Sequence, residues 1–231
     1  MKFPLSVIAS IVVSSLLSSC NRPYQINGTV EVYGYDGKNL SLVSCSDGSF
    51  RVIDSCRVNH GTFHMKGKTD DVRFVVLCKE GEPIMPLYIE GGKTNVAVMP
   101  TYLKASGTKQ NDLLYGFLQK KSLIDDRYED IFQKKMNLMK SGKSNQKEIS
   151  AIEDSLSCIV KEAEELIFHF ITKNYKEQVA IGIFSMMCNS SQDSSFVTPL
   201  MRKILDNAPE EFLDAPNIQA YVGRVGYSSI N

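Results

Sequence analysis

Several residue types and motifs associated with catalysis are scarce or missing from this chain. It has no tryptophan, only three histidines and no C-x-x-C pair. Without a G-x-S-x-G motif, three histidines give no support for a nucleophilic triad. Basic and acidic residues both number 26, so the formal net charge is zero, and no long run of one sign occurs. This charge balance argues against a nucleic-acid partner. Because the catalytic motifs are missing, we expect no catalytic residue and no cofactor.

Long apolar runs are also few, and the longest lies at the N-terminus. Met1-Lys2 is a short basic start, and residues 5–17 are thirteen residues without a charge. Such a run is too short to cross a hydrocarbon core, which needs about 20 residues, but it suits the apolar part of a secretory signal. No second run long enough to span a bilayer follows, so we expect no internal membrane span.

The apolar run ends in a short motif with a known counterpart. Leu17-Ser18-Ser19-Cys20 resembles the lipobox of bacterial lipoproteins, in which the cysteine thiol receives a diacylglyceryl group and becomes the new N-terminus. The resemblance implies that Cys20 is the lipidation site, that Leu17 fills an apolar subsite of the peptidase, and that Ser18 and Ser19 let the backbone enter its cleft. Two or more acyl chains make such an anchor stable. The alternative is an ordinary signal peptide with a cysteine near its cleavage site.

The residues that follow Cys20 indicate which membrane the lipid anchor would occupy. Some Gram-negative bacteria retain lipoproteins at the inner membrane through an aspartate after the cysteine, but this chain has Asn21. The next residues, 22–24, lack the acidic cluster that some phyla use for export to the cell surface. We therefore expect a cell-envelope protein held to the outer membrane by its lipid anchor, on the periplasmic face.

The mature chain is long enough for a substantial core. Residues 20–231 amount to 212 residues, a length that buries roughly 70% of the unfolded chain's surface. We expect four segments, and they are a signal peptide at 1–19, a lipidated cysteine and tether at 20–23, an antiparallel β domain at 24–107 and a helical segment at 108–231.

The first half of the mature chain has the pattern of a sheet. Residues 26–33 alternate between an apolar and a more polar face, which predicts a strand. Asp36-Gly37 predicts a hairpin turn to a returning strand, and Glu90-Gly91-Gly92-Lys93 predicts another hairpin. Short strands with glycine-centred turns predict an antiparallel β-sandwich or open barrel. The further strands are expected at 40–45, 51–58, 62–66, 72–78, 85–89 and 94–99.

Five stretches of this half resemble the family called domain of unknown function 4369. They are residues 26–30, 53–55, 58–67, 88–93 and 104–111. The resemblance implies an envelope β domain, which in related lipoproteins often precedes a thioredoxin-like reductase domain. Residues 207–213 resemble the tail of the helical segment that lies before that domain, and the chain stops at Asn231, so we expect no thioredoxin domain here. Reductase activity is not carried over, because thiol exchange requires a low-pKa cysteine pair.

After Gly107 the apolar residues recur at three- and four-residue steps, which predicts helices. A helix at 111–140 and a second from about Asn145, which would cap it, form an antiparallel pair. Their apolar stripes are interpreted as core, with a groove for a partner helix or an apolar ligand as the alternative. Shorter helices are expected at 177–187, at 199–207 with Thr198 as cap, and at 216–222.

One spacing raises the question of a metal site. A hairpin that turns near His60 would bring Cys56 and His64 onto facing strands, and zinc accepts cysteine and histidine ligands. No fourth ligand and no orienting carboxylate are implied. We therefore interpret these histidines as solvated and expect no metal.

Five cysteines remain after Cys20, an odd number in a compartment that permits disulfides. Their spacing is irregular, and the simplest interpretation is buried, inert thiols. The alternative is that Cys188 or Cys158 is exposed and forms mixed disulfides. The five are Cys45, Cys56, Cys78, Cys158 and Cys188.

These observations favour a non-enzymatic binding or scaffolding module that presents a sheet face or helix groove to another envelope component. The first alternative is an accessory to a separate thioredoxin-like oxidoreductase. The second is capture of a small ligand between sheet and helices, which requires an apolar cleft of roughly 300 Å³ or more.

Overall fold

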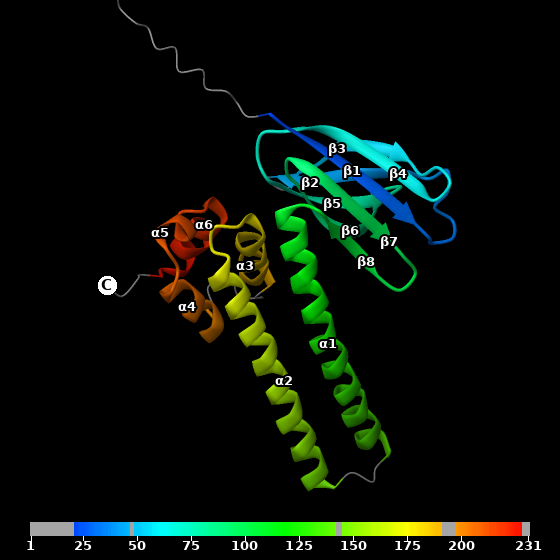
Figure 1. Ribbon diagram of the computed structural model, residues 1–231. Helices are drawn as coiled ribbons and strands as arrows, with labels where there is room; N and C mark the ends of the chain where they lie inside the picture. Colours follow the sequence, from blue (N-terminus) through cyan, green and yellow to red (C-terminus); the bar gives the residue numbers. More distant parts are fainter. Residues whose placement is uncertain (1–20, 47–48, 142–144, 191–196, 228–231) are drawn as a thin grey trace, which may run out of the picture.

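The computed structural model describes residues 21–46, 49–141, 145–190 and 197–227, and within them a two-layered β domain is followed by helices (Figure 1). The strands are β1 (Arg22–Val30), β2 (Asn39–Ser46), β3 (Ser49–Arg57), β4 (Thr62–Thr69), β5 (Arg73–Lys79), β6 (Glu82–Ile89), β7 (Gly92–Val98) and β8 (Leu103–Ser106). Strand β8 was not among the predicted strands.

The strands form two four-stranded sheets that pack face to face. Sheet 1 has the order β4-β1-β7-β8 and sheet 2 the order β3-β2-β5-β6. Every pairing is antiparallel except that of β1 with β7, which is parallel. The predicted α+β class and the open sandwich are confirmed, and the two sheets do not close into a barrel.

The core of the sandwich follows from alternation along the strands. In β1, Tyr24, Ile26, Gly28 and Val30 are buried, whereas the residues that alternate with them are exposed or half-buried. Successive side chains of a strand point to opposite faces, so one face of each sheet is apolar and faces the other sheet. Each fully buried aliphatic side chain contributes about 1.5–3 kcal/mol. Further buried members of this core are Leu40, Leu42, Phe63, Met65, Val75, Leu77, Met85, Leu87, Val96 and Val98.

Two connections differ from prediction. The turn at Tyr35 and Gly37 forms, with Lys38 N donating to Tyr35 O at 3.0 Å and Gly37 at a φ of 72°. It leads from β1 in sheet 1 to β2 in sheet 2, so it is not a hairpin. The turn at 90–93 likewise leads from β6 in sheet 2 to β7 in sheet 1. A local turn signal shows where the chain reverses but not which sheet the next strand joins.

The second half is helical, as predicted. Asn145 caps the second helix by accepting from Lys147 N, and Thr198 caps the fourth by accepting from Met201 N. The helices are α1 (Lys109–Ser141), α2 (Gln146–Lys173), α3 (Gln178–Ser190), α4 (Pro199–Asp206), α5 (Glu210–Leu213) and α6 (Pro216–Val225). The short helix α5 was not predicted.

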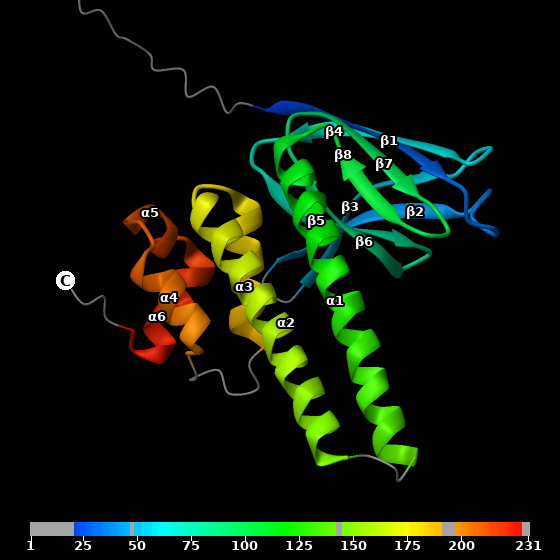
Figure 2. The ribbon, with the colours of Figure 1, turned by 60° about the horizontal axis from the view of Figure 1, so that its bottom comes forward.

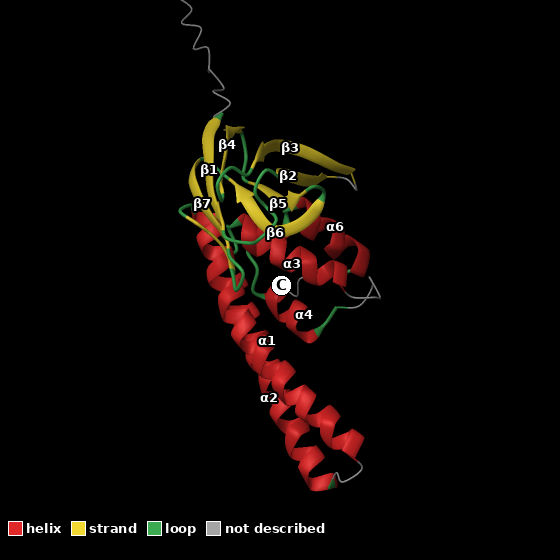
Figure 3. Ribbon diagram, turned by 90° about the vertical axis from the view of Figure 1, so that its right-hand side faces the viewer, coloured by secondary structure: helices red, strands yellow, loops and turns green. Residues whose placement is uncertain are grey.

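Helices α1 and α2 run antiparallel and project from the body as a two-helix arm (Figures 1 and 3). The other helices gather beside the base of α2, where Phe184, Phe212 and Tyr221 make edge-to-face ring contacts (Figure 2). Helix α3 packs on the outer face of sheet 2, where Tyr88 Oη donates to Gln178 O at 3.3 Å. Within the described residues, no helix combines the length and the hydropathy needed to cross a bilayer.

Candidate binding groove at the seam of the sandwich

The open sandwich leaves a seam between the edge strands β6 and β8, and the first turns of α1 cover half of it. Asn111 Oδ1 accepts from Tyr88 N at 2.9 Å, and Asn111 Nδ2 donates to Tyr88 O at 2.8 Å. One turn later, Tyr115 Oη donates to Pro86 O at 2.9 Å. Pro86 has no N–H to leave unpaired, which suits an edge position. Helix α1 therefore supplies side-chain partners for the outer edge of β6.

The start of α1 is also joined to α3. Gln110 Nε2 donates to Glu177 Oε2 at 2.7 Å, and Gln110 Oε1 accepts from Val179 N at 2.9 Å. Lys109 forms an ion pair with Glu177 at 2.5 Å. The hydrogen bond from Lys109 is the main reason why the pKa of Glu177 lies below its ordinary value. These polar contacts join the base of the arm to the start of α3.

The uncovered half of the seam is a groove of about 760 Å³ between β8 and α1. Its rim carries large apolar side chains, with Tyr102 53%, Leu103 42% and Leu123 63% exposed. Its polar groups include Gln119 and Ser122. The volume lies in the range of ordinary ligand and peptide clefts. It also exceeds the size that small-ligand capture requires, so that alternative remains compatible with the structure.

The edge of β8 offers backbone groups at this groove. Met99 N donates to Tyr102 O, and Glu31 N donates to Val98 O from the β1 side. In an antiparallel ladder, hydrogen-bonded and non-hydrogen-bonded residue pairs alternate. Met99 and Tyr102 are a hydrogen-bonded pair, so the adjacent pair of Val98 and Leu103 is not. Leu103 therefore points its N–H and C=O away from β7. Neither group has a backbone partner in the part of the chain that the structure describes. The groove therefore combines exposed apolar side chains with an unpaired strand edge.

The titratable groups at the groove do not form an acid–base pair. The carboxylate of Asp112 accepts from Gly107 N at 3.0 Å, and burial raises the pKa of Tyr115 above its ordinary value. A phenol held neutral by burial donates a hydrogen bond and does not act as a base near neutral pH.

A second apolar surface lies on the arm. Tyr128 and Phe132 of α1 stack with ring centroids 6.1 Å apart, and both are about one-third exposed. Val160 of α2 is also exposed. The ion pairs Arg127–Glu162 and Lys135–Glu153 join the two helices across their interface. The arm is thus held as a pair, with apolar side chains left on its surface.

The predicted lipidation site and its flanking motif, Leu17, Ser18, Ser19 and Cys20, lie outside the described residues. The described chain begins at Asn21, and Arg22 already opens β1. An anchor at Cys20 would therefore attach to the sandwich through a single intervening residue.

The residues of the considered metal spacing do not assemble into a site. His64 Nδ1 lies 2.9 Å from Asn27 Oδ1 on the exposed face of sheet 1. His60 occupies the turn with a φ of 49°, and Cys56 is half-buried. No group of three or more potential metal-binding side chains occurs among the residues described.

The cysteines have different environments. Cys78 and Cys188 are buried, Cys56 is half-buried and Cys158 is exposed on α2. Burial raises the pKa of the Cys56 and Cys78 thiols and raises that of Cys188 to about 12. The interpretation of buried thiols is confirmed for Cys78 and Cys188, and the alternative of an exposed Cys188 is wrong, because α3 turns it into the helical core. Cys158 is the exposed candidate that remains within the described ranges.

Sequence reasoning did not identify the groove. Tyr102 and Leu103 follow the last predicted strand and belong to no periodic pattern. The stretch 104–111 did carry a signal, because it was part of the family resemblance, but its role as the joint between β8, β6 and α1 required coordinates.

Comparison with known proteins agrees with the β domain. Residues 24–114 match the model of the family described as Domain of unknown function (DUF4369). The match ends inside α1, three residues beyond Asn111, so it includes the turn of helix that completes the edge of β6. No curated protein and no solved structure gave a significant match.

Proposed function

We propose that this protein is a lipid-anchored cell-envelope binding module, and that its groove takes an extended peptide segment of another envelope protein. The observation that carries the binding role is the groove itself, where Leu103 offers an unpaired N–H and C=O beside exposed Tyr102 and Leu123. A peptide that adds to a strand edge gains main-chain hydrogen bonds and places alternate side chains in adjoining pockets. The outer membrane, on its periplasmic face, is the proposed location.

The anchor is supported by the lipobox resemblance at Cys20 and by the position of Arg22 at the very start of β1. A lipid at Cys20 would hold the sandwich close to a bilayer. Substitution of Cys20 with alanine is expected to give a product without acyl chains that leaves the membrane fraction.

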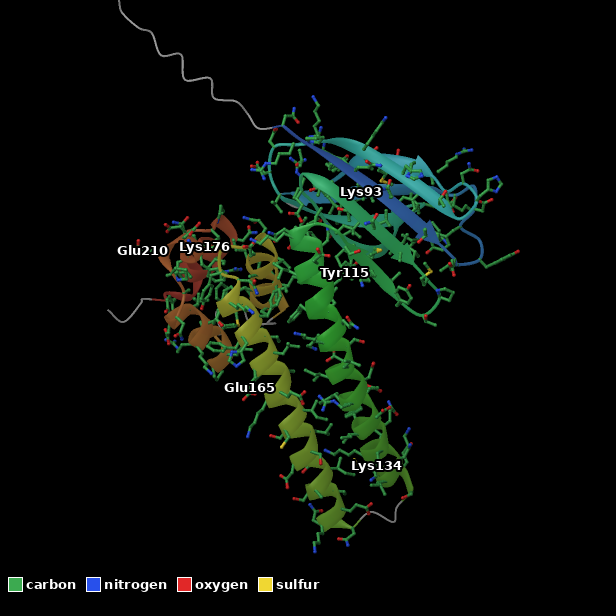
Figure 4. The ribbon with its side chains drawn as sticks, viewed as in Figure 1. Lys93, Tyr115, Lys134, Glu165, Lys176 and Glu210 are labelled. Carbon is green, nitrogen blue, oxygen red and sulfur yellow. The ribbon has the colours of Figure 1, made fainter. Side chains whose placement is uncertain are left out.

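The binding role is tested by photo-crosslinking in cells. A photoreactive residue at Gln119, in the groove, is expected to capture one contiguous segment of an envelope protein, whereas the same residue at exposed Glu165 on α2 is not (Figure 4). A synthetic peptide of the captured segment should then bind the purified protein. Equal capture at both positions, or capture of lipid alone, would contradict the proposal.

A matched pair of glycine variants connects the peptide to the groove. Gly116 lines the groove and Gly223 lies in α6, and both face open space where a side chain could be added. Gly116→Phe should abolish binding of the peptide and Gly223→Phe should leave it unchanged. If both variants bind equally, the peptide occupies another surface.

A role as a redox accessory is the second candidate, and exposed Cys158 is the observation that favours it. It predicts mixed disulfides with a separate thioredoxin-like protein, and Cys158→Ser would abolish them. Retention of the groove-dependent peptide in Cys158→Ser separates the two candidates.

A further inference from the structure

Within strands β1, β4, β7 and β8, the residues that point to the outer face of sheet 1 carry charges of one sign only. The registers of β1 with β4 and β7, and of β7 with β8, show which side chains share the face that points away from the core. They are Pro23, Gln25, Asn27, Thr29, Thr62, His64, Lys66, Lys68, Lys93, Asn95, Ala97, Lys104 and Ser106. The four lysines of this set, Lys66, Lys68, Lys93 and Lys104, are called the cationic face. The set contains no aspartate and no glutamate.

The charges of the cationic face are not neutralised within the described residues. All four of its lysines are exposed, and none forms an ion pair there. Lysines elsewhere do pair, as in Lys38–Glu80 and Lys121–Asp125. Because the whole chain has zero formal net charge, the cationic face is a local segregation of charge.

The composition of this face also limits what it can bind. Between the lysines lie amides and an imidazole, and Asn27 Oδ1 accepts from Gln25 Nε2 at 2.9 Å. No large apolar side chain belongs to the set. The centres of protein–protein interfaces are rich in aromatic residues and poor in lysine. A cationic surface without apolar anchors instead suits an anionic headgroup layer, which it can approach without inserting.

An anchor at Cys20 would hold the start of sheet 1 within a short distance of the bilayer. This step rests on the proposed lipidation of Cys20. Arg22 begins β1 two residues after Cys20, so the chain between them spans at most about 7 Å. This is within the Debye length of about 8 Å at physiological ionic strength. In sheet 1, Pro23 lies opposite Lys68 and Gln25 lies beside Lys93 (Figure 4). The cationic face therefore begins at the anchored end of the sheet.

We propose that the cationic face of sheet 1 lies against the anionic headgroups of the bilayer that holds the anchor. The far end of the α1–α2 arm lies away from the start of β1, where the anchor would attach (Figures 1 and 3). Each lysine near an anionic surface strengthens association roughly fivefold.

Lysine acetylation footprinting of the full mature protein in vesicles tests the contact. In vesicles of phosphatidylglycerol and phosphatidylcholine, the cationic face should be labelled several-fold more slowly than in phosphatidylcholine alone. Exposed Lys134, Lys147 and Lys161 on the arm serve as internal controls and should be labelled equally in both. High salt should remove the protection. Equal labelling of the face in both kinds of vesicle would overturn the proposal.

Two triple variants with the same change in net charge separate position from charge. Lys68 is the reporter in both. In the variant with Lys66, Lys93 and Lys104 changed to Gln, the protection of Lys68 should be lost. In the control variant, Lys134, Lys147 and Lys161 are changed to Gln, and the protection of Lys68 should persist. Loss in both variants would show a non-specific charge effect and would contradict the proposal.

Failure of this contact and failure of the anchor are distinguishable. The mass of the N-terminal peptide reports acylation of Cys20 independently of the footprint. An acylated protein without lysine protection overturns the contact and leaves the anchor standing. Protection that occurs in cells but not in purified anionic vesicles assigns the face to an anionic macromolecule and also overturns the bilayer contact.

Discussion

Asn111 takes the place of a neighbouring strand for Tyr88. Its side-chain amide accepts from the backbone N–H of Tyr88 at 2.9 Å and donates to the backbone C=O of the same residue at 2.8 Å. Asn111 is 0% exposed, so bulk water does not compete for these hydrogen bonds. At Tyr88, the edge strand β6 would otherwise present an unpaired N–H and C=O, and one helical residue satisfies both.

This relationship predicts a large effect of Asn111→Ala. The substitution leaves a buried N–H and a buried C=O without partners, and each such loss costs about 1–3 kcal/mol. The free energy of unfolding, measured by urea denaturation, should fall by about 2–5 kcal/mol. Asn137→Ala on the exposed arm of the same helix is the control and should change it by less than about 0.5 kcal/mol. Equal effects would show that the edge of β6 does not depend on Asn111.

Tyr115→Phe removes only the hydroxyl that donates to Pro86 O. The ring remains in place, so the expected loss is about 1 kcal/mol in the free energy of unfolding. Tyr128→Phe on the same helix, where the side chain is 37% exposed, should be close to neutral. If Tyr115→Phe is also neutral, water satisfies Pro86 O and the contact is not part of the joint.

Gly28→Ala tests the packing between β1 and β4. A Cβ at Gly28 would lie 1.9 Å from Cε1 of Phe63, whose ring is 1% exposed and occupies the space that the glycine leaves. We expect a loss of stability of about 1–3 kcal/mol from the forced repacking. Gly116→Ala meets no atom within 4 Å, and as a helical site it should gain up to about 1 kcal/mol. A stable Gly28→Ala variant would contradict the position of the Phe63 ring.

Glu177 predicts a pH dependence of stability. Its pKa is lowered in the folded protein, chiefly by the hydrogen bond from Lys109. A carboxyl with a depressed folded pKa stabilises the fold above its unfolded pKa, and this contribution is lost as the pH falls through the folded value. The difference in unfolding free energy between the wild type and Glu177→Gln should therefore shrink as the pH is lowered below the ordinary range of glutamate. A constant difference would contradict the ionised state assigned to Glu177.

Thiol reactivity separates the cysteines. Alkylation of the native protein should modify Cys158 first, because it is exposed, while Cys56, Cys78 and Cys188 react slowly since burial raises the pKa of each thiol. Unfolding should equalise their rates. If Cys158 is also unreactive in the native state, the redox candidate loses its only supporting observation.

Local patterns predicted the elements well. Alternation from residue 26 and the three- and four-residue steps after Gly107 are set by neighbouring residues, so the presence of strands and helices could be read directly. The bounds were less exact, since β1 runs over Arg22–Val30 and does not reach residue 33. Sheet membership could not, because Gly37 and the turn at 90–93 have the composition of hairpin turns yet carry the chain across the sandwich. That choice depends on which buried faces meet, and no local signal encodes it.

The contact between Asn111 and β6 and the groove beside β8 could not be predicted from the sequence. Asn111 pairs with a backbone 23 positions earlier in the chain, and an asparagine near a helix start is ordinarily interpreted as a cap. Leu103 became recognisable as an edge residue only when the register of β7 and β8 was known. Conversely, the resemblance to a lipobox at Cys20 rests on a purely local motif, and it stays a prediction from the sequence.

The mass of the N-terminal peptide of the mature protein tests the central claim of membrane anchoring most directly. The account predicts that the mature chain begins at Cys20 and that this residue carries a thioether-linked diacylglyceryl group. An unmodified Cys20 thiol, or a mature chain that begins at another residue, would contradict it.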